Sequence, residues 1–323
     1  MMTTILIALA AGSASALMFA SIISGALISL VLFYLAPLPL MVAALGWGPL
    51  AATIGGITAA TGLGLIFGLP YCIAFAVTVA LPAWWLGHLA LLGRPVANVA
   101  SGNGAAPVAP ALEWYPVGRI LLWIAGFAIL TTIAALLTLG SDAEAITGAL
   151  RRGLLRMLGP RDAESAGDVE RWVDALVVVA PAAAATVAMM TLTLNLWLAA
   201  KITATSGRLH RPWPDLRSAA LPPMTLVALS IALAFCFAGG LPALLAQIVA
   251  TALMMAYAFT GFAVLHTLTL ALKSRAFLLS CTYAIVMMFG WPVLAMVALG
   301  VTDAVFGIRQ RYLRTRPPPL PAS

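Results

Sequence analysis

Charged residues are absent from the first 93 positions of this chain, and that absence restricts the fold more than any motif does. No Asp, Glu, Lys or Arg occurs between Met1 and Gly93, and in the whole chain only 8% of residues are charged while 63% are hydrophobic. A soluble domain carries roughly 25% charged residues. The lipid bilayer selects long uncharged segments, because polar groups in hydrocarbon cost free energy. We therefore predict an integral membrane protein that crosses the bilayer several times.

Proline and glycine divide the apolar sequence into helices. Gly46-Trp47-Gly48-Pro49 and Gly68-Leu69-Pro70 are strong breaks, since proline fixes φ and glycine permits the turn. The pattern predicts an all-α fold, a polytopic transmembrane helix bundle of about eight spans with one amphipathic surface helix. The expected helices cover about 4–20, a second arm that ends at 45, 49–67, a fourth that ends at 92, 117–140, 169–205, 219–238, 242–272 and 277–307.

Composition along the chain predicts its domain organisation. We expect the helix that begins at Thr4 to be retained in the membrane, because no Arg or Lys precedes Arg94 to form the basic region of a cleaved leader. The predicted parts are N-terminal transmembrane helices over 1–93, a flexible loop over 94–117, a transmembrane helix over 118–140, an amphipathic charged insertion over 141–173, C-terminal transmembrane helices over 174–307 and a basic disordered tail over 308–323.

Residues 141–174, the charged insertion and the residue that follows it, hold seven of the ten acidic residues of the chain. Ser141 and Glu144 have the spacing of a capping box, and Gly159-Pro160 is expected to end the helix. Apolar residues recur every four positions, at Ile146, Leu150, Leu154 and Leu158. Such a helix either docks a partner protein, with its basic side chains as contacts, or packs as a surface helix that joins two membrane halves. The partner-docking candidates here are Arg151, Arg152 and Arg156.

Basic residues near the C-terminus bear on membrane orientation. The net charge of +7 comes from scattered loop arginines, so it indicates cytoplasmic loops rather than nucleic-acid binding. Both the 208–217 segment and the tail should then be cytoplasmic. However, if each of the three apolar stretches between them crosses the membrane once, the two segments lie on opposite sides. We expect one stretch to be a hairpin or re-entrant, with Gly290-Trp291-Pro292 as the break. Within 208–217, Trp213 and Asp215 lie in a rigid Pro-rich loop that is a second candidate partner surface.

Six short motifs resemble one bacterial family. They are Phe33-Tyr34-Leu35-Ala36-Pro37-Leu38-Pro39, Gly46-Trp47-Gly48-Pro49, Asn195-Leu196-Trp197, Ser206-Gly207-Arg208-Leu209, Arg211-Pro212-Trp213-Pro214-Asp215-Leu216 and Phe289-Gly290-Trp291-Pro292. Together they resemble the YybS-like predicted membrane proteins, catalogued as domain of unknown function 2232. That family is grouped distantly with the substrate-binding components of energy-coupling-factor vitamin transporters. The resemblance implies a helical bundle in the bacterial inner membrane that binds a small molecule or a partner membrane subunit.

Four polar residues in apolar segments are candidate ligand contacts, because polar groups inside a membrane are rare and often functional. Asn195 and Gln247 could instead hydrogen-bond between helices. His266 could titrate or be a satisfied core histidine. Asp303 could contact a ligand, or could cap or pair at the interface with Arg309.

Recognised catalytic patterns do not occur in the sequence: it has no nucleophile elbow, P-loop, dinucleotide-binding fingerprint or HExxH, and its three cysteines lie far apart. We predict no enzyme activity, no catalytic residues, no metal site and no cofactor. A membrane-embedded enzyme is the last of three hypotheses, because no catalytic constellation is present. In the other two, the chain either binds or transports a small molecule, or it is a membrane scaffold that recruits partners through the insertion and the basic loop. The expected location is the bacterial cytoplasmic membrane, with a cytoplasmic tail.

Overall fold

The computed structural model describes residues 1–96, 111–158 and 166–315, and these residues are almost entirely helical. Seven helical segments in this described part are long and apolar enough to cross a membrane, or eight if one bent pair counts as a span. The predicted all-α transmembrane bundle of about eight spans is confirmed. The chain is a multi-pass membrane protein.

The helices form two compact units that do not follow the linear order of the predicted domains. Unit 1 consists of Met1–Ile124 and Met190–Pro214, and unit 2 of Ala125–Met189 and Asp215–Ser323. Two long helices, α7 (Val117–Leu137) and α9 (Ala166–Thr205), each contribute one part to each unit. Length allows this division, because a 40-residue helix extends about 60 Å, roughly twice the hydrocarbon thickness.

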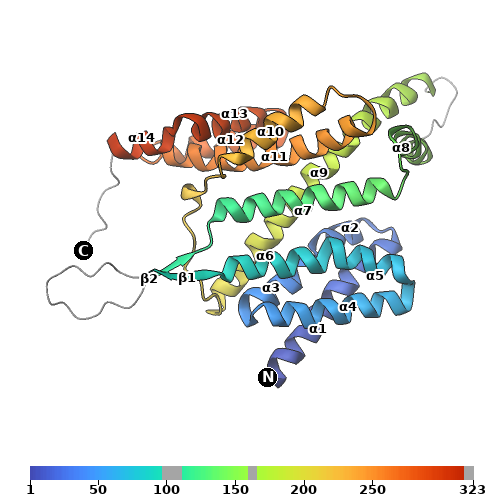
Figure 1. Cartoon of the computed structure of the whole chain (residues 1–323), viewed down its shortest axis with the longest axis horizontal. Helices are drawn as coiled ribbons and strands as arrows, with labels where there is room; N and C mark the ends of the chain where they lie inside the picture. The colour runs from blue at the N-terminus through green and yellow to red at the C-terminus, as the bar shows by residue number, and fades with distance from the viewer. Residues whose placement is uncertain (97–110, 159–165, 316–323) are drawn as a thin grey trace. The chain divides into compact units, whose positions relative to one another are not determined.

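Unit 1 is built on close contact between helices that carry small residues. Its N-terminal elements are α1 (Met2–Ala20), η1 (Ser21–Ser24), α2 (Leu27–Leu35), α3 (Pro37–Trp47), α4 (Pro49–Phe67), α5 (Leu69–Phe75), η2 (Ala76–Ala80) and α6 (Leu81–Leu91) (Figure 1). Both predicted breaks occur, at Gly48 (φ 94°) and Gly68 (φ 93°). A Cβ atom on Gly12 would collide with the carbonyl of Gly55, so glycine permits the backbones of α1 and α4 to touch.

A short hairpin replaces part of the predicted flexible loop in unit 1. Strand β1 (Gly93–Val96) pairs antiparallel with β2 (Ala111–Trp114), with Gly93 opposite Trp114. The 94–117 segment is therefore ordered at both ends, and its middle lies outside the described residues. Backbone pairing explains the difference, since two extended segments satisfy each other's polar groups.

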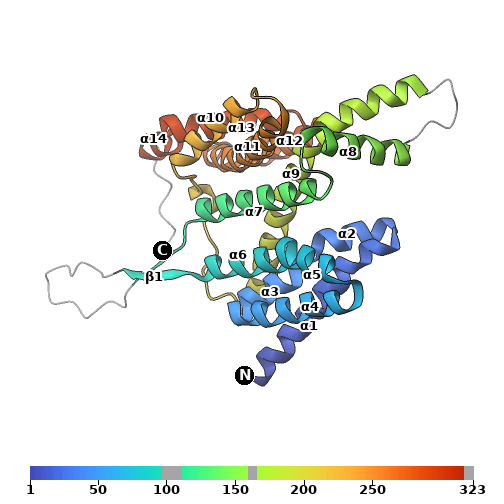
Figure 2. The same cartoon turned by 45° about the vertical axis from the view of Figure 1, so that its right-hand side comes forward.

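Unit 2 is organised around α11 (Gly240–Leu268), its longest and most buried complete helix. Helix α13 (Val293–Phe306) packs along α11, where Gly261 and Gly300 let the two backbones approach too closely for a Cβ atom. The remaining elements are η4 (Leu216–Ser218), α10 (Met224–Phe235), α12 (Arg275–Phe289) and α14 (Ile308–Thr315). Helices α10 to α13 lie side by side in two views (Figure 1 and Figure 2).

The amphipathic insertion forms α8 (Ala143–Leu158), which packs against other helices within unit 2. Ile146 is fully buried in a cluster with Leu136, Ala185 and Ile248, and Leu150 packs beside it. The predicted capping box named the wrong residue as the N-cap of this helix. The Asp142 carboxylate, rather than the Ser141 hydroxyl, accepts a hydrogen bond from the Ala145 N–H at 2.8 Å, because the helix begins one residue later than expected. Its predicted end at Gly159-Pro160 lies outside the described residues.

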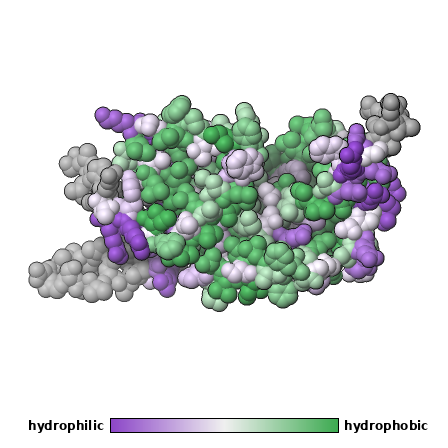
Figure 3. All heavy atoms as spheres, turned by 90° about the horizontal axis from the view of Figure 1, so that it is seen from above, coloured by the Kyte–Doolittle hydropathy of each residue, from purple (hydrophilic) through white to green (hydrophobic). Residues whose placement is uncertain are grey.

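The C-terminal third bends at two glycines. Gly290 (φ 70°) separates α12 from α13, which confirms the predicted break into two short arms. Gly307 (φ 63°) then turns the chain by 71° into α14. The prediction of a disordered tail over 308–323 is therefore wrong for residues 308–315, which are helical. Residues 316–323 lie outside the described residues. Figure 3 shows a largely hydrophobic face with hydrophilic residues gathered toward its two ends.

Candidate functional site

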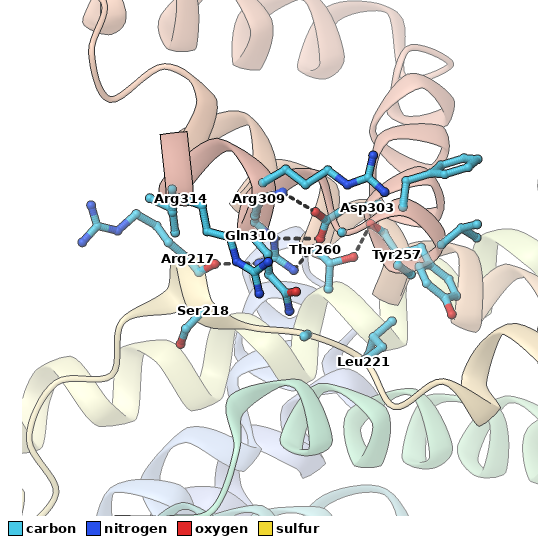
Figure 4. Close-up of a pocket in the computed structure, with 17 residues that line it drawn as sticks. Arg217, Ser218, Leu221, Tyr257, Thr260, Asp303, Arg309, Gln310 and Arg314 are labelled. Atoms are coloured by element: carbon cyan, nitrogen blue, oxygen red, sulfur yellow. Dashed lines mark hydrogen bonds and ion pairs between the residues drawn. The ribbon is translucent and has the colours of Figure 1, made fainter. Parts of the chain in front are cut away.

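A pocket of about 700 Å³ opens in unit 2 where α13 turns into α14. Helix α11 supplies one wall, α13 and α14 supply two more, and the segment from Arg217 to Leu221 closes the remaining side. Figure 4 shows Arg217 and Arg314 on one side of this pocket and Tyr257 on the other. The lining residues are Arg217, Ser218, Ala220, Leu221, Tyr257, Thr260, Gly300, Asp303, Ala304, Val305, Phe306, Gly307, Arg309, Gln310, Arg311, Leu313 and Arg314.

A buried ion pair forms the base of the pocket. Two Arg309 nitrogens reach one Asp303 oxygen, with Nε at 2.8 Å and Nη2 at 2.7 Å from Oδ2. The backbone N–H of Arg309 donates to the other carboxylate oxygen, Oδ1, at 2.8 Å. Only 7% of the Asp303 side chain and 11% of the Arg309 side chain are exposed. Of the two sequence interpretations of Asp303, the structure shows the pairing with Arg309.

The same guanidinium also fixes the segment that leads into α10. Nη1 of Arg309 donates to the carbonyl oxygen of Arg217 at 2.6 Å and to that of Ala219 at 2.9 Å. Arginine is suited to this role because its five donors are held in one plane. One side chain thus ties three parts of unit 2 together at the pocket.

Gly307 explains why residues six positions apart can pair. It ends α13 in the left-handed conformation (φ 63°, ψ 43°), and its N–H donates to the Asp303 carbonyl at 2.8 Å. Glycine adopts this conformation without steric cost, so the helix ends there and the chain turns by 71°. Arg309 then returns to the carboxylate on the last turn of α13.

Positive charge dominates the lining of the pocket. Four arginines, at 217, 309, 311 and 314, oppose a single carboxylate, Asp303. Arg217 is also paired outside the pocket with Asp215, at 2.8 Å, and this hydrogen bond lowers the pKa of the Asp215 carboxyl. The guanidinium groups of Arg311 and Arg314 make no ion pair with any described residue. The pocket therefore has free cationic groups beside a neutralised pair, an arrangement that favours an anion.

The four residues predicted to contact a ligand do not form one site. Asp303 alone lines the pocket. Asn195 is fully buried in unit 1, where its Nδ2 donates to the carbonyls of Tyr34 and Thr191, each at 2.8 Å. Its contacts are those of a residue that joins helices.

The other two candidates lie on α11, outside this pocket. His266 Nε2 is 2.8 Å from the Tyr283 hydroxyl on α12, and the Tyr283 ring stacks on Phe262 with centroids 5.1 Å apart. These contacts attach α12 to α11. Gln247 is half-buried on α11.

The predicted partner surfaces divide in the same way. Arg151 pairs with Asp174 at 2.8 Å, so it holds α8 against α9, whereas Arg152 and Arg156 are exposed. In the basic loop, residues 208–217, the ring centroid of Trp213 lies 4.5 Å from the ammonium of Lys201 on α9.

Arg211 is a structural anchor that the sequence did not single out. It donates to the carbonyl oxygens of Ala90 at 3.2 Å and Tyr115 at 3.0 Å, and burial lowers the pKa of its guanidinium. Arg208 lies 4.7 Å from the ring centroid of Trp47. The first half of the basic loop is thus fastened to unit 1. The one sequence signal of this role is that Arg211 is followed by a proline and then a tryptophan, in Arg211-Pro212-Trp213.

The described residues contain no group of three or more His, Cys, Asp or Glu side chains able to hold a metal ion. No family model, curated protein or solved structure matches this chain.

Proposed function

We propose that this chain is a membrane-embedded binding protein for a small anionic molecule, which it binds in the α11–α13–α14 pocket. One observation carries the proposal: Arg311 and Arg314 line a 700 Å³ pocket and have no ion-pair partner among the described residues. Pockets of about 300–1,000 Å³ are the usual size for small ligands. Guanidinium groups match carboxylate and phosphate oxygens in bidentate geometry.

The division of labour among the arginines supports this function. Arg309 is neutralised by Asp303 and bonded to two carbonyls, so it is a rigid part of the wall. Arg311 and Arg314 follow Arg309 on the same helix, α14, and their guanidinium groups are available to bind a ligand. A preorganised wall lowers the entropy cost of binding, because fewer groups must be ordered with the ligand.

The proposal extends to location and to a role in transport. We place α14 on the cytoplasmic side of a bacterial inner membrane, since arginine-rich segments that flank membrane helices favour that side. The family resemblance implies that a binding component of this kind works with a partner membrane subunit. Binding is the part of the proposal that the pocket supports.

Thermal unfolding with a panel of anions tests the proposal. The protein, purified in a neutral detergent, is heated with phosphate monoesters, carboxylates and a cationic control compound. A ligand at about 100 times its Kd adds about 2.7 kcal/mol to the folded state. We expect stabilisation by at least one anion, lost in R311Q/R314Q and retained in R152Q/R156Q. The control variant removes the same charge from exposed arginines of unit 2. Equal stabilisation of both variants contradicts a pocket site.

A scaffold remains the second candidate because one side of the distal half of α8 is exposed. Beyond the anchored Ile146, Met157 is 84% exposed and lies near the exposed Arg152 and Arg156. Deleting the helix is a poor test, since it removes a core residue. Charge reversal, R152E/R156E, keeps the core and should abolish co-purification of a partner. Unchanged partner recovery contradicts the scaffold.

A further inference from the structure

Exposed apolar side chains adjoin the free arginines of the pocket. Phe306 is 58% exposed, Val305 is 53% exposed and Leu313 is 39% exposed, and all three line the same cavity as Arg311 and Arg314. A site for a small hydrophilic anion has no use for this apolar surface. A ligand that is charged at one end and apolar at the other would contact both kinds of side chain.

The bend at Gly307 places this two-sided lining at the edge of a membrane helix. Helix α13 is apolar apart from Thr302 and the buried Asp303, and the chain then turns by 71° into α14, which carries Arg309, Arg311 and Arg314. A basic helix that follows an apolar one at a steep angle is typical of the membrane–water interface. In a helix pair of this kind, the apolar side chains before the bend face acyl chains and the basic side chains after it lie at the level of the headgroups.

We infer that the anion bound in the pocket is the phosphate of an anionic membrane phospholipid. This inference rests on the proposed function and names its ligand class. The phosphate accepts hydrogen bonds from the guanidinium groups of Arg311 and Arg314, and the acyl chains cover Val305 and Phe306. Basic pockets between transmembrane helices on the cytoplasmic side are known to bind lipid headgroups.

Three probes separate a lipid from a soluble anion. The protein in neutral detergent is titrated with dioleoyl-phosphatidylglycerol, with its water-soluble headgroup glycerophosphoglycerol, and with zwitterionic dioleoyl-phosphatidylcholine. Native mass spectrometry counts bound molecules, and thermal unfolding reports stabilisation. We expect phosphatidylglycerol to bind at least about tenfold more tightly than either other probe. The soluble headgroup lacks acyl chains for the apolar lining, and the choline cation of phosphatidylcholine cancels the charge of its phosphate and is repelled by the arginines.

Matched variants assign the binding to the pocket. R311Q/R314Q should weaken phosphatidylglycerol binding about tenfold or more, whereas R152Q/R156Q should leave it unchanged. F306S should weaken the lipid but not the soluble headgroup. If glycerophosphoglycerol binds as tightly as the lipid, the inference is overturned and the proposed anion site stands. If neither anion stabilises the protein, both fail. Equal lipid binding by the wild type and R311Q/R314Q identifies non-specific lipid and also overturns the inference.

Discussion

Removal of the Arg309 guanidinium should destabilise unit 2 more than the loss of any exposed charge. Arg309→Gln leaves the Asp303 carboxylate, 7% exposed, without its cation, and leaves the carbonyls of Arg217 and Ala219 without a donor. Breaking a buried pair from one side costs about 3–5 kcal/mol. The backbone N–H of Arg309 still donates to Oδ1, so we expect the lower end, about 3 kcal/mol.

The complementary change should cost less. Asp303→Asn removes the negative charge, but Arg309 keeps its two carbonyl acceptors, and we expect a loss of about 2 kcal/mol. The double variant D303N/R309Q leaves no unpaired buried charge. Its cost should therefore fall short of the sum of the single costs by about 1–3 kcal/mol, the interaction energy of contacting residues.

Reversible unfolding in mixed micelles of neutral detergent and sodium dodecyl sulfate, followed by far-ultraviolet circular dichroism, measures these free energies. The matched control is Arg217→Gln, which breaks an exposed pair with Asp215 and should cost less than about 1 kcal/mol. An interaction energy below about 0.5 kcal/mol would refute the reasoning, because it would show that water already solvates the pair.

Three further predictions concern packing, capping and acid stability. Gly300→Ala places a Cβ against a carbonyl of α11 and should cost about 1–3 kcal/mol in the same unfolding assay. Asp142→Ala removes the cap of α8 and should cost about 1 kcal/mol, with Ser141→Ala as a neutral control. The pKa of Asp215 is depressed by its bond to Arg217, so its contribution to stability is present above the ordinary pKa of about 4 and lost as pH falls through the folded value. Asp215→Asn should therefore flatten the stability profile below about pH 4, and an unchanged profile counts against the pair.

Helix boundaries could be predicted because they depend on local chemistry. Gly48, Gly68 and Gly290 take positive φ values at the places where glycine and proline interrupt apolar sequence. Each break needs only a few neighbouring residues, so the sequence alone reveals it. The apolar face of α8 was predictable for the same reason, and the burial of Ile146 follows from it.

The pocket could not be predicted because it depends on tertiary contacts. The sequence allowed Asp303 to pair with Arg309, but it did not show that this pair lines a pocket at the bend after Gly307. Arg311 and Arg314 face a cavity only because α11 supplies the opposite wall. Asn195 illustrates the converse. A polar residue inside a span suggests a ligand, yet its amide is used by the carbonyl of Tyr34, which lies 161 positions away in the chain.

Arginine modification measures occupancy of the pocket most directly. Phenylglyoxal reacts with accessible guanidinium groups, and peptide mass spectrometry reads each site separately, with and without phosphatidylglycerol or glycerophosphoglycerol. We predict that an anion slows modification of Arg311 and Arg314 about tenfold, while Arg152 and Arg156 react at an unchanged rate. Equal protection of all four arginines, or protection of none, would contradict an anion site in this pocket.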